Sequence, residues 1–291
     1  MQTGGADWTS KELSAMACRF AAIVLEAGNA ILPVFAAPTG ERLKSDNSPV
    51  CAADELAEDL ILKMLAKDFP DIPVVSEEAA ARHAPGPQEG SFILADPLDG
   101  TREFLAGRPD FTVNIALIHQ GQPLAGAVFA PARAELWAGF GGAAAGAWKA
   151  ATNRSGAVVA DLLAPELRQA IRARPLPATG RLLLTSRSHI EDQTKAFSRT
   201  IPNAAERAEG SSTKFCRIAE GAADIYPRFS PTMEWDTAAG DAILRAAGGM
   251  TFDAAGLPLA YGKAGYRNGP FAAWGEPAQA ANFPLSGQPG K

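Results

Sequence analysis

The chain has 291 residues, a length that suits two packed halves better than one compact core. Hydrophobic residues make up 47% and charged residues 20%, the ordinary composition of a soluble globular protein. The net charge of −5 argues against a binder of nucleic-acid polymers, which needs a basic face, but is compatible with a small phosphorylated ligand held by a few cations.

The N-terminus and the cysteines carry no sign of export. Residues 1–10 lack the apolar core of a signal peptide, and no run approaches 18 apolar residues, so we predict no transmembrane segment. Cys18, Cys51 and Cys216 fit neither a disulfide framework nor a zinc site, which favours a reducing compartment. We predict a cytoplasmic protein, with peripheral association at the inner membrane face as an alternative.

In the first half, hydrophobic spacing predicts two helices followed by several strands. The expected elements are, in chain order, a helix over 11–35, a loop or short hairpin over 38–50, a helix over 54–67, strands at 72–76 and 92–95 with a mobile loop at 79–90 between them, and a meander of strands at 111–119, 124–130 and 134–140.

In the second half, strands and helices are expected to alternate, which predicts an α/β architecture. The expected elements are a strand at 181–185, helices at 191–199 and 213–220, a strand at 223–226, a helix at 234–247 and a strand at 250–252. A cluster of small and polar residues near 150–158 predicts a boundary. We therefore divide the chain into an N-terminal half (1–155), a C-terminal half (156–275) and a disordered tail (276–291) rich in Pro, Gly, Ala and Gln.

Two carboxylates lie on one tight turn directly after an apolar strand. Asp96 and Asp99 are three residues apart, and Gly100 allows the chain to turn sharply. Carboxylates this close repel one another unless a cation lies between them, and hard oxygen ligands suit Mg²⁺. A solvated acidic turn with a capping aspartate would give the same pattern.

Two further acidic segments strengthen the metal interpretation. Ser76-Glu77-Glu78 ends another apolar strand, and Asp236 opens a helix whose small residues allow close approach to other backbone. Each alone also fits a structural role, the first as an exposed acidic loop and the second as a helix cap. Three such segments in one chain are difficult to explain by coincidence.

The sequence contains no serine or cysteine in a nucleophile-elbow setting. Two or more Mg²⁺ ions would instead provide the nucleophile by lowering the pKa of a bound water. The Thr101 hydroxyl would orient that water, and a nearby carboxylate would accept its proton.

These three acidic segments resemble the signatures of the inositol monophosphatase superfamily, a group of Mg²⁺-dependent, lithium-sensitive phosphatases. Within the superfamily the chain looks most like the CysQ-type 3′(2′),5′-bisphosphate nucleotidases, and the matching stretches are 44–50, 102–104, 111–118, 210–216 and 226–229. The resemblance spans roughly residues 10–275 and implies an α/β fold, a layered α/β/α/β/α sandwich of two halves.

The resemblance also implies a role for each matching residue. The metal ligands for two or three Mg²⁺ ions would be Glu77, Asp96, Asp99, Asp236 and the Leu98 carbonyl. Asp54 and Thr101 would be catalytic and activate water. The substrate-binding residues would be Gly100, Thr101, His189, Ser211, Lys214, Arg228 and Asp236. Cys51 stands where these enzymes usually carry threonine; because a thiol is a poor hydrogen-bond partner, we expect a modest effect on metal affinity or rate.

The resemblance implies an enzyme that removes the 3′-phosphate of adenosine 3′,5′-bisphosphate, with the sulfated nucleotide as a second candidate substrate. Inositol 1-phosphate and fructose 1,6-bisphosphate are the alternatives within the superfamily. A metal-binding regulatory protein without turnover is the alternative of another class. The expected partner is a small phosphorylated nucleotide, and the expected assembly is a monomer or a homodimer.

Overall fold

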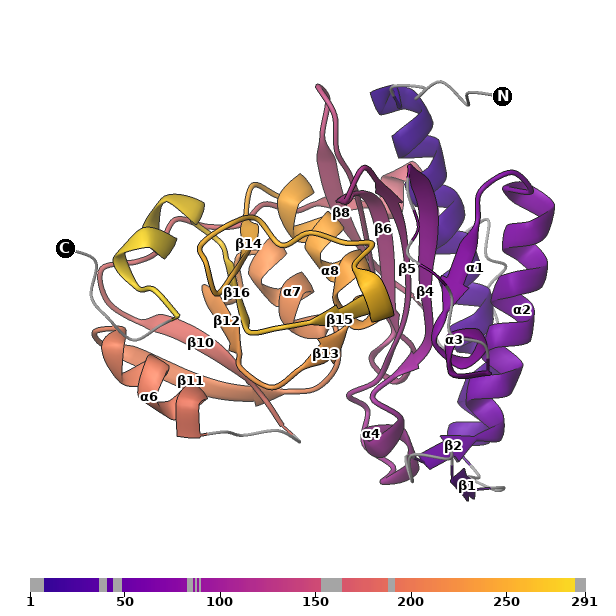
Figure 1. Ribbon diagram of the computed structural model, residues 1–291, viewed down its shortest axis with the longest axis horizontal. Coiled ribbons are helices and arrows are strands. Elements are labelled where there is room, and N and C mark those ends of the chain that lie inside the picture. The colour runs from indigo at the N-terminus through magenta and orange to yellow at the C-terminus, as the bar shows by residue number, and fades with distance from the viewer. Residues whose placement is uncertain are drawn as a thin grey trace.

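The computed structural model describes residues 8–36, 41–43, 49–82, 86, 88, 90–152, 164–187 and 192–285. Two β-sheets lie face to face with helices between them and further helices on both outer sides (Figure 1). This is the five-layered α/β/α/β/α arrangement that the family resemblance implied.

The larger sheet has seven strands in the order β3-β4-β5-β6-β7-β8-β9. Its strands are β3 (Val74–Ser76), β4 (Ser91–Asp99), β5 (Thr112–His119), β6 (Gln122–Ala130), β7 (Glu135–Phe140), β8 (Gly146–Ala151) and β9 (Gln169–Ala170). β3 and β4 are parallel, and the other neighbours are antiparallel. Because β3 and β4 run the same way, Glu77, directly after β3, lies at the same edge of the sheet as Asp96 and Asp99, which are in the last residues of β4. Strand β4 thus continues beyond the predicted strand at 92–95 and includes both carboxylates.

Helices α1 (Ser10–Ala36) and α2 (Ala52–Asp68) cover the outer face of this sheet (Figure 1). By length and hydropathy alone, α1 is able to cross a membrane. Most of its apolar stretch is buried, however, and residues such as Phe20, Ile23 and Val24 are fully enclosed in the core. The core helix of a soluble protein has the same properties, since it too needs an apolar face to pack on a sheet.

Helices α7 (Thr213–Ala219) and α8 (Trp235–Ala246) form the layer between the two sheets. They contact each other closely at Gly240, where a Cβ atom would lie 2.7 Å from the Phe215 side chain. At Ala239 helix α8 also approaches the backbone of β6, since a Cβ atom at Gly126 would lie 2.8 Å from the Ala239 carbonyl oxygen, and this confirms the prediction that small residues after Asp236 permit close approach to other backbone. This packing brings the beginnings of both helices to the same place.

The second sheet has five strands in the order β11-β10-β12-β16-β14. They are β10 (Arg181–Ser186), β11 (Ala204–Glu209), β12 (Ile225–Arg228), β14 (Met250–Asp253) and β16 (Phe271–Trp274). Strands β10, β11 and β12 are parallel, and β16 is antiparallel to both β12 and β14. Helix α6 (Asp192–Thr200) lies on the outer side of this sheet and completes the fifth layer (Figure 1).

Several short elements connect these layers. They are β1 (Glu41–Leu43), β2 (Pro49–Cys51), α3 (Glu77–Arg82), α4 (Thr101–Leu105), β13 (Thr232–Met233), β15 (Arg267–Asn268) and the 3-10 helices Pro131–Arg133, Pro165–Leu167, Ala264–Tyr266 and Pro277–Asn282. β1 pairs with β2, as expected for the short hairpin at 38–50.

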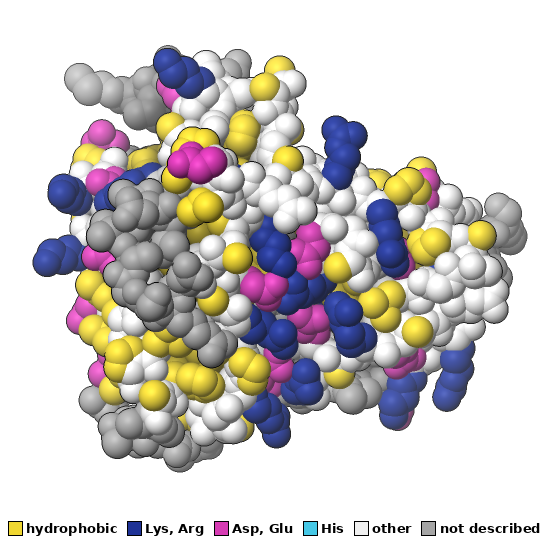
Figure 2. All heavy atoms as spheres, turned by 180° about the vertical axis from the view of Figure 1, so that it is seen from behind, with side chains coloured by type: hydrophobic (Ala, Val, Ile, Leu, Met, Phe, Trp, Pro, Cys, Tyr) yellow, Lys and Arg dark blue, Asp and Glu magenta, His cyan; other side chains and the backbone are white. Residues whose placement is uncertain are grey.

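Ion pairs fasten α7 to both sheets. Arg217 of α7 pairs with Glu135 of β7 at 2.5 Å and with Glu209 of β11 at 3.0 Å. Seen from behind, the molecule shows basic and acidic side chains interleaved across its middle (Figure 2). Partial burial by itself would raise the pKa of Glu135, but its hydrogen bonds and ion pairs with Arg217 and Lys149 outweigh burial, so the pKa of Glu135 lies below its usual value.

The structure differs from three of the predictions made from the sequence. The first turns of the predicted mobile loop 79–90 belong to α3, which begins at Glu77. The predicted disordered tail is wrong for residues 276–285, because Pro277–Asn282 form a 3-10 helix and Phe283 stacks on Trp274. Strand β9 pairs with β8, so the first sheet continues beyond the predicted boundary at residue 155.

Candidate active site

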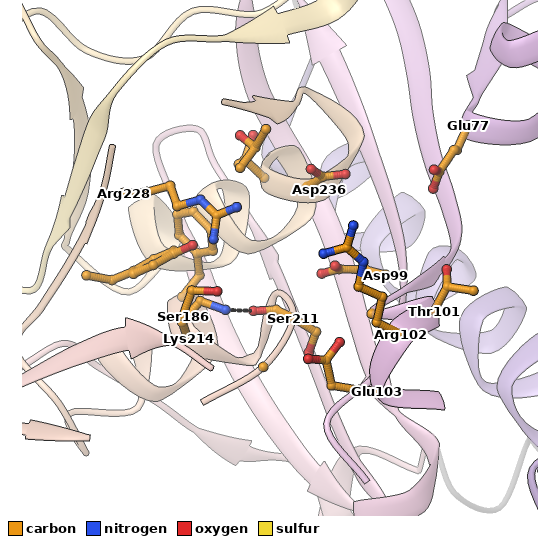
Figure 3. Close-up of a pocket in the computed structure, with 16 residues that line it drawn as sticks. Glu77, Asp99, Thr101, Arg102, Glu103, Ser186, Ser211, Lys214, Arg228 and Asp236 are labelled. Carbon is orange, nitrogen blue, oxygen red and sulfur yellow. Dashed lines mark hydrogen bonds between the residues drawn. The ribbon is translucent and has the colours of Figure 1, made fainter. Parts of the chain in front are cut away.

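A cavity of about 220 Å³ opens where the carboxyl end of β4, the start of α8 and the second sheet meet (Figure 3). Charged and polar side chains from segments far apart in the sequence line it. The lining residues are Glu77, Asp99, Gly100, Thr101, Arg102, Glu103, Ser186, Gly210, Ser211, Lys214, Phe215, Tyr226, Arg228, Thr232, Asp236 and Thr237.

The irregular end of β4, from Asp96 to Asp99, and the turn at Gly100 shape one wall of this cavity. The register between β4 and β5 shifts between Asp96 and Asp99, which turns both carboxylates out of the regular strand pattern. Gly100 has φ 95°, and a Cβ atom there would lie 2.9 Å from the Asp110 carbonyl oxygen, so only glycine fits. Thr101 then begins α4 and donates its hydroxyl to the Leu98 carbonyl at 3.2 Å.

Asp96 is buried behind the cavity wall, with 1% of its surface exposed. Its Oδ1 accepts a hydrogen bond from the Leu98 backbone N–H at 3.0 Å, whereas its Oδ2 has no hydrogen-bond partner. Burial raises the pKa of Asp96 well above its usual range, and the neighbouring carboxylates of Glu77, Asp99, Asp236 and Asp54 raise it further. A buried oxygen without a partner in such a negative environment is suited to a cation.

Asp99 and Asp236 face the same cavity from the two halves of the molecule (Figure 3). Asp236 lies in the first turn of α8, and its Oδ2 accepts a hydrogen bond from the Met233 N–H at 2.8 Å. Burial raises the pKa of both carboxyl groups, and in Asp236 the charges of Asp99 and Glu77 add to this effect. The carboxylates therefore destabilise one another when all are ionised.

The opposite wall of the cavity carries two buried cations, Lys214 of α7 and Arg228 of β12. Lys214 donates from Nζ to the Ser211 carbonyl at 2.6 Å, and its Nζ lies 4.9 Å from the centre of the Tyr226 ring. Burial lowers the pKa of Lys214 to about 8, although the nearby Asp99 opposes this change. This wall offers positive charge to an anionic ligand while the other wall offers carboxylates to a metal.

The donor set fits Mg²⁺, which prefers a few carboxylates completed by waters and ligand oxygens. Within the residues that the structure describes, no three acidic, histidine or cysteine side chains are drawn together tightly enough to enclose a cation as they stand. Mutual repulsion of the carboxylates opposes such clustering, and a divalent cation would remove that repulsion. Glu77, Asp99 and Asp236 on the cavity surface and Asp96 behind it would hold the metal.

Most of the predicted site residues line this one cavity. Those that do so are Glu77, Asp99, Gly100, Thr101, Ser211, Lys214, Arg228 and Asp236. Asp54, Asp96 and the Leu98 carbonyl do not line it, and Asp54 and Asp96 are 1% exposed. The charge of Asp54 reaches Asp96, and β2, which ends three residues before Asp54, contacts α4. His189 and the Cys51 side chain lie outside the described residues.

Eight lining residues had no site role predicted from the sequence. They are Arg102, Glu103, Ser186, Gly210, Phe215, Tyr226, Thr232 and Thr237. Arg102 and Glu103 directly follow the acidic turn, and this adjacency was a usable signal. Ser186 and Tyr226 reach the cavity because the second sheet folds against the first, and Thr232 reaches it from β13. Tyr226 belongs to the matching stretch 226–229, whereas nothing in the local sequence marks Ser186 or Thr232.

Comparison with known proteins identifies the family. A model of the inositol monophosphatase family matches residues 12–282 of the chain. The chain belongs to the inositol monophosphatase family. The 3′(2′),5′-bisphosphate nucleotidase CysQ of Salmonella typhimurium is 41% identical over 237 residues, which cover 81% of this chain and 89% of that protein. The corresponding protein of Escherichia coli O157:H7 is 40% identical over the same length.

Solved structures of the family have the same fold. CysQ from Bacteroides thetaiotaomicron superposes with a TM-score of 0.71 and 35% identity, covering 90% of this chain and 96% of that chain. An inositol monophosphatase from Anabaena superposes with a TM-score of 0.68 over 92% of both chains, but its identity of 22% supports the shared fold alone.

Proposed function

We propose that this member of the inositol monophosphatase family is a Mg²⁺-dependent 3′(2′),5′-bisphosphate nucleotidase. It would hydrolyse the 3′-phosphate of adenosine 3′,5′-bisphosphate to give AMP and phosphate, with the sulfated nucleotide as a second substrate. The observation that carries this proposal is the division of one cavity into an acidic wall and a basic wall, formed by Asp99 and Asp236 on one side and Lys214 and Arg228 on the other. A substrate with two phosphates needs both walls, one for the metal ions that act on the reacting phosphate and one to bind the second phosphate.

The acidic wall would serve the reacting phosphate. Glu77, Asp96, Asp99, Asp236 and the Leu98 carbonyl would hold two or three Mg²⁺ ions. Bound Mg²⁺ supplies Lewis-acid stabilisation of phosphate oxygens and increases the acidity of water. Thr101 would orient the attacking water and Asp54 would accept its proton, so that the bond between phosphorus and the ribose 3′-oxygen breaks as the new bond to water forms.

The basic wall would bind the phosphate that does not react. Lys214 and Arg228 are buried, so their charge is little screened by solvent, and an arginine matches a phosphate with two parallel hydrogen bonds. Ser211, next to them, has φ 48° and lies in the turn that begins α7. Gly100 and His189 complete the proposed substrate-binding set. We expect the enzyme in the cytoplasm, either as a monomer or as a homodimer.

A substrate panel tests this proposal. Purified protein with Mg²⁺ is expected to release phosphate from adenosine 3′,5′-bisphosphate with a kcat/KM at least tenfold higher than from inositol 1-phosphate or fructose 1,6-bisphosphate. The Asp99→Asn variant is the control for contaminating phosphatases, since it should lose nearly all turnover while its thermal stability without metal is kept.

Other results of the panel would assign the cavity differently. Faster release from inositol 1-phosphate or fructose 1,6-bisphosphate would replace the nucleotide by that substrate. No release from any substrate, together with Mg²⁺ binding, would support a regulatory protein that kept the metal site and lost turnover.

A further inference from the structure

A buried carboxylate outside the cavity connects two of the segments that approach the metal site. Glu58 of α2 has 1% of its surface exposed. Its Oε1 accepts hydrogen bonds from the Ser76 hydroxyl at 2.5 Å and from the Ala79 backbone N–H at 2.9 Å. Its Oε2 forms an ion pair with Arg82 at 3.1 Å. None of these four residues belongs to the cavity lining.

The partners of Glu58 surround Glu77 in the sequence. Ser76 is the last residue of β3, and Ala79 and Arg82 belong to α3, which begins at Glu77. The first backbone N–H groups of a helix have no partner within the helix. Glu58 supplies the acceptor for one of them, so the orientation of α3 depends on a side chain from another helix.

Glu58 also lies one helical turn after Asp54 on α2. Residues four apart in a helix project from the same face, so both carboxylates are directed toward the same side of α2. Both are buried. One carboxylate thus joins the helix that carries the proposed water-activating Asp54 to the short helix that carries the proposed metal ligand Glu77.

We propose that Glu58 is a positioning residue that holds Glu77 toward the metal site and keeps it in register with Asp54. The proposal rests on the proposed function for the identity of the cation, Mg²⁺. Carboxylates around an unfilled cation site repel one another. A six-residue helix has little stability of its own, so without a fixed anchor α3 would turn Glu77 away from the other ligands. Residues that orient metal ligands typically contribute a factor of 10–100 to metal affinity.

Mg²⁺ affinity in the absence of substrate tests this role. We expect Glu58→Ala to weaken Mg²⁺ binding about tenfold, measured by calorimetry and by the Mg²⁺-induced rise in Tm. Glu58→Gln keeps the size and one acceptor oxygen and should lose less affinity. Arg82→Gln removes only the partner of Oε2 and should also have a smaller effect. The matched control is Asp59→Asn, on the exposed side of the same helix, which should bind Mg²⁺ like the wild type.

The outcomes separate a positioning role from a purely structural one. A lower metal-free Tm with unchanged Mg²⁺ affinity in the Glu58 variants would overturn the proposal. If Glu58→Ala does not fold, the Glu58→Gln and Arg82→Gln affinities decide the question in the same way. Wild-type protein that binds no Mg²⁺ would overturn the proposed function itself, whereas Mg²⁺ binding without nucleotide hydrolysis would leave the role of Glu58 intact.

Discussion

At the scale of single residues, Arg102 is the positively charged side chain that directly follows the acidic turn ending at Thr101. It belongs to α4, and its guanidinium extends into the cavity near Asp99 (Figure 3). Among the residues that the structure describes, its side chain has no hydrogen-bond or ion-pair partner. Lys214, in contrast, donates hydrogen bonds to the backbone carbonyls of Glu209, at the end of β11, and of Ser211. Arg102 is therefore available to bind an anionic substrate without breaking an internal contact.

We expect Arg102→Ala to raise the KM for adenosine 3′,5′-bisphosphate about tenfold, because a hydrogen bond to a charged group contributes about 1.5–3 kcal/mol. The Tm should stay within about 1 °C of the wild type, since exposed side chains contribute little to stability. Steady-state kinetics and a thermal scan measure both values. Arg108→Ala, an exposed arginine outside the cavity lining, is the matched control. An unchanged KM in Arg102→Ala would exclude contact with substrate.

At the scale of elements, the C-terminal 3-10 helix, Pro277–Asn282, packs against strands β14 and β16 of the second sheet. The Phe283 ring stacks on Trp274 of β16 with centroids 5.9 Å apart and an angle of 15°. Leu285 packs against the same small core, which also contains Leu183 and Phe197. Composition predicted disorder here because most residues of the segment are small or polar. Ala280, Phe283 and Leu285 nevertheless pack on this core, and Glu276 accepts a hydrogen bond from the Leu176 N–H, so the segment is held against the second sheet.

Phe283→Ala should lower the free energy of unfolding by about 1–2 kcal/mol, less than for a fully buried phenylalanine because its ring is only half-buried. Urea denaturation measures this change. Phosphate release per folded molecule should be unaffected, since the residue is not part of the cavity lining. A variant as stable as the wild type would show that the segment contributes nothing to the second sheet.

At the scale of the whole molecule, folding brings mutually repelling carboxylates into one place. The pKa values of Asp96 and Asp236 are raised well above the usual range, chiefly by burial and then by the neighbouring acids. A carboxyl group whose pKa is raised by folding favours the native state below its unfolded pKa, about 3.9 for aspartate. That contribution is lost as the pH rises through the raised pKa. The metal-free site therefore lowers the free energy of unfolding by a growing amount as the pH rises toward neutral and alkaline values.

Asp96→Asn isolates this effect from the other titrating groups. In the presence of a chelator, the difference in Tm between the variant and the wild type should be small near pH 4 and should grow in favour of the variant up to pH 8. Added Mg²⁺ should raise the wild-type Tm increasingly with pH, because metal binding requires deprotonated ligands. It should raise the variant's Tm much less. A difference in Tm that is independent of pH would contradict the raised pKa of Asp96.

The sequence by itself determined the features whose signal is local. Hydrophobic periodicity predicted α1, α2, α8 and the central strands of the first sheet, because burial of one face imposes a regular spacing. The acidic segment at the end of β4 was recognisable for a similar reason, since Asp96, Asp99 and Thr101 lie within six residues. Local patterns failed at β11, whose sequence Ala-Ala-Glu-Arg-Ala-Glu has helical composition but becomes a strand by pairing with β10.

Only the tertiary structure decided which distant residues meet. The face-to-face packing of the two sheets places Lys214 and Arg228 opposite Asp99, and it brings Ser186, Tyr226 and Thr232 into the same cavity. The contact between Glu58 and Ser76 likewise joins residues 18 positions apart. Which distant residues meet depends on how the layers pack and on which buried polar groups need hydrogen-bond partners. No short segment of sequence carries this information. The acidic turn was visible in the sequence, but the basic wall opposite it and the contacts of Glu58 with the segment around Glu77 exist only in the fold.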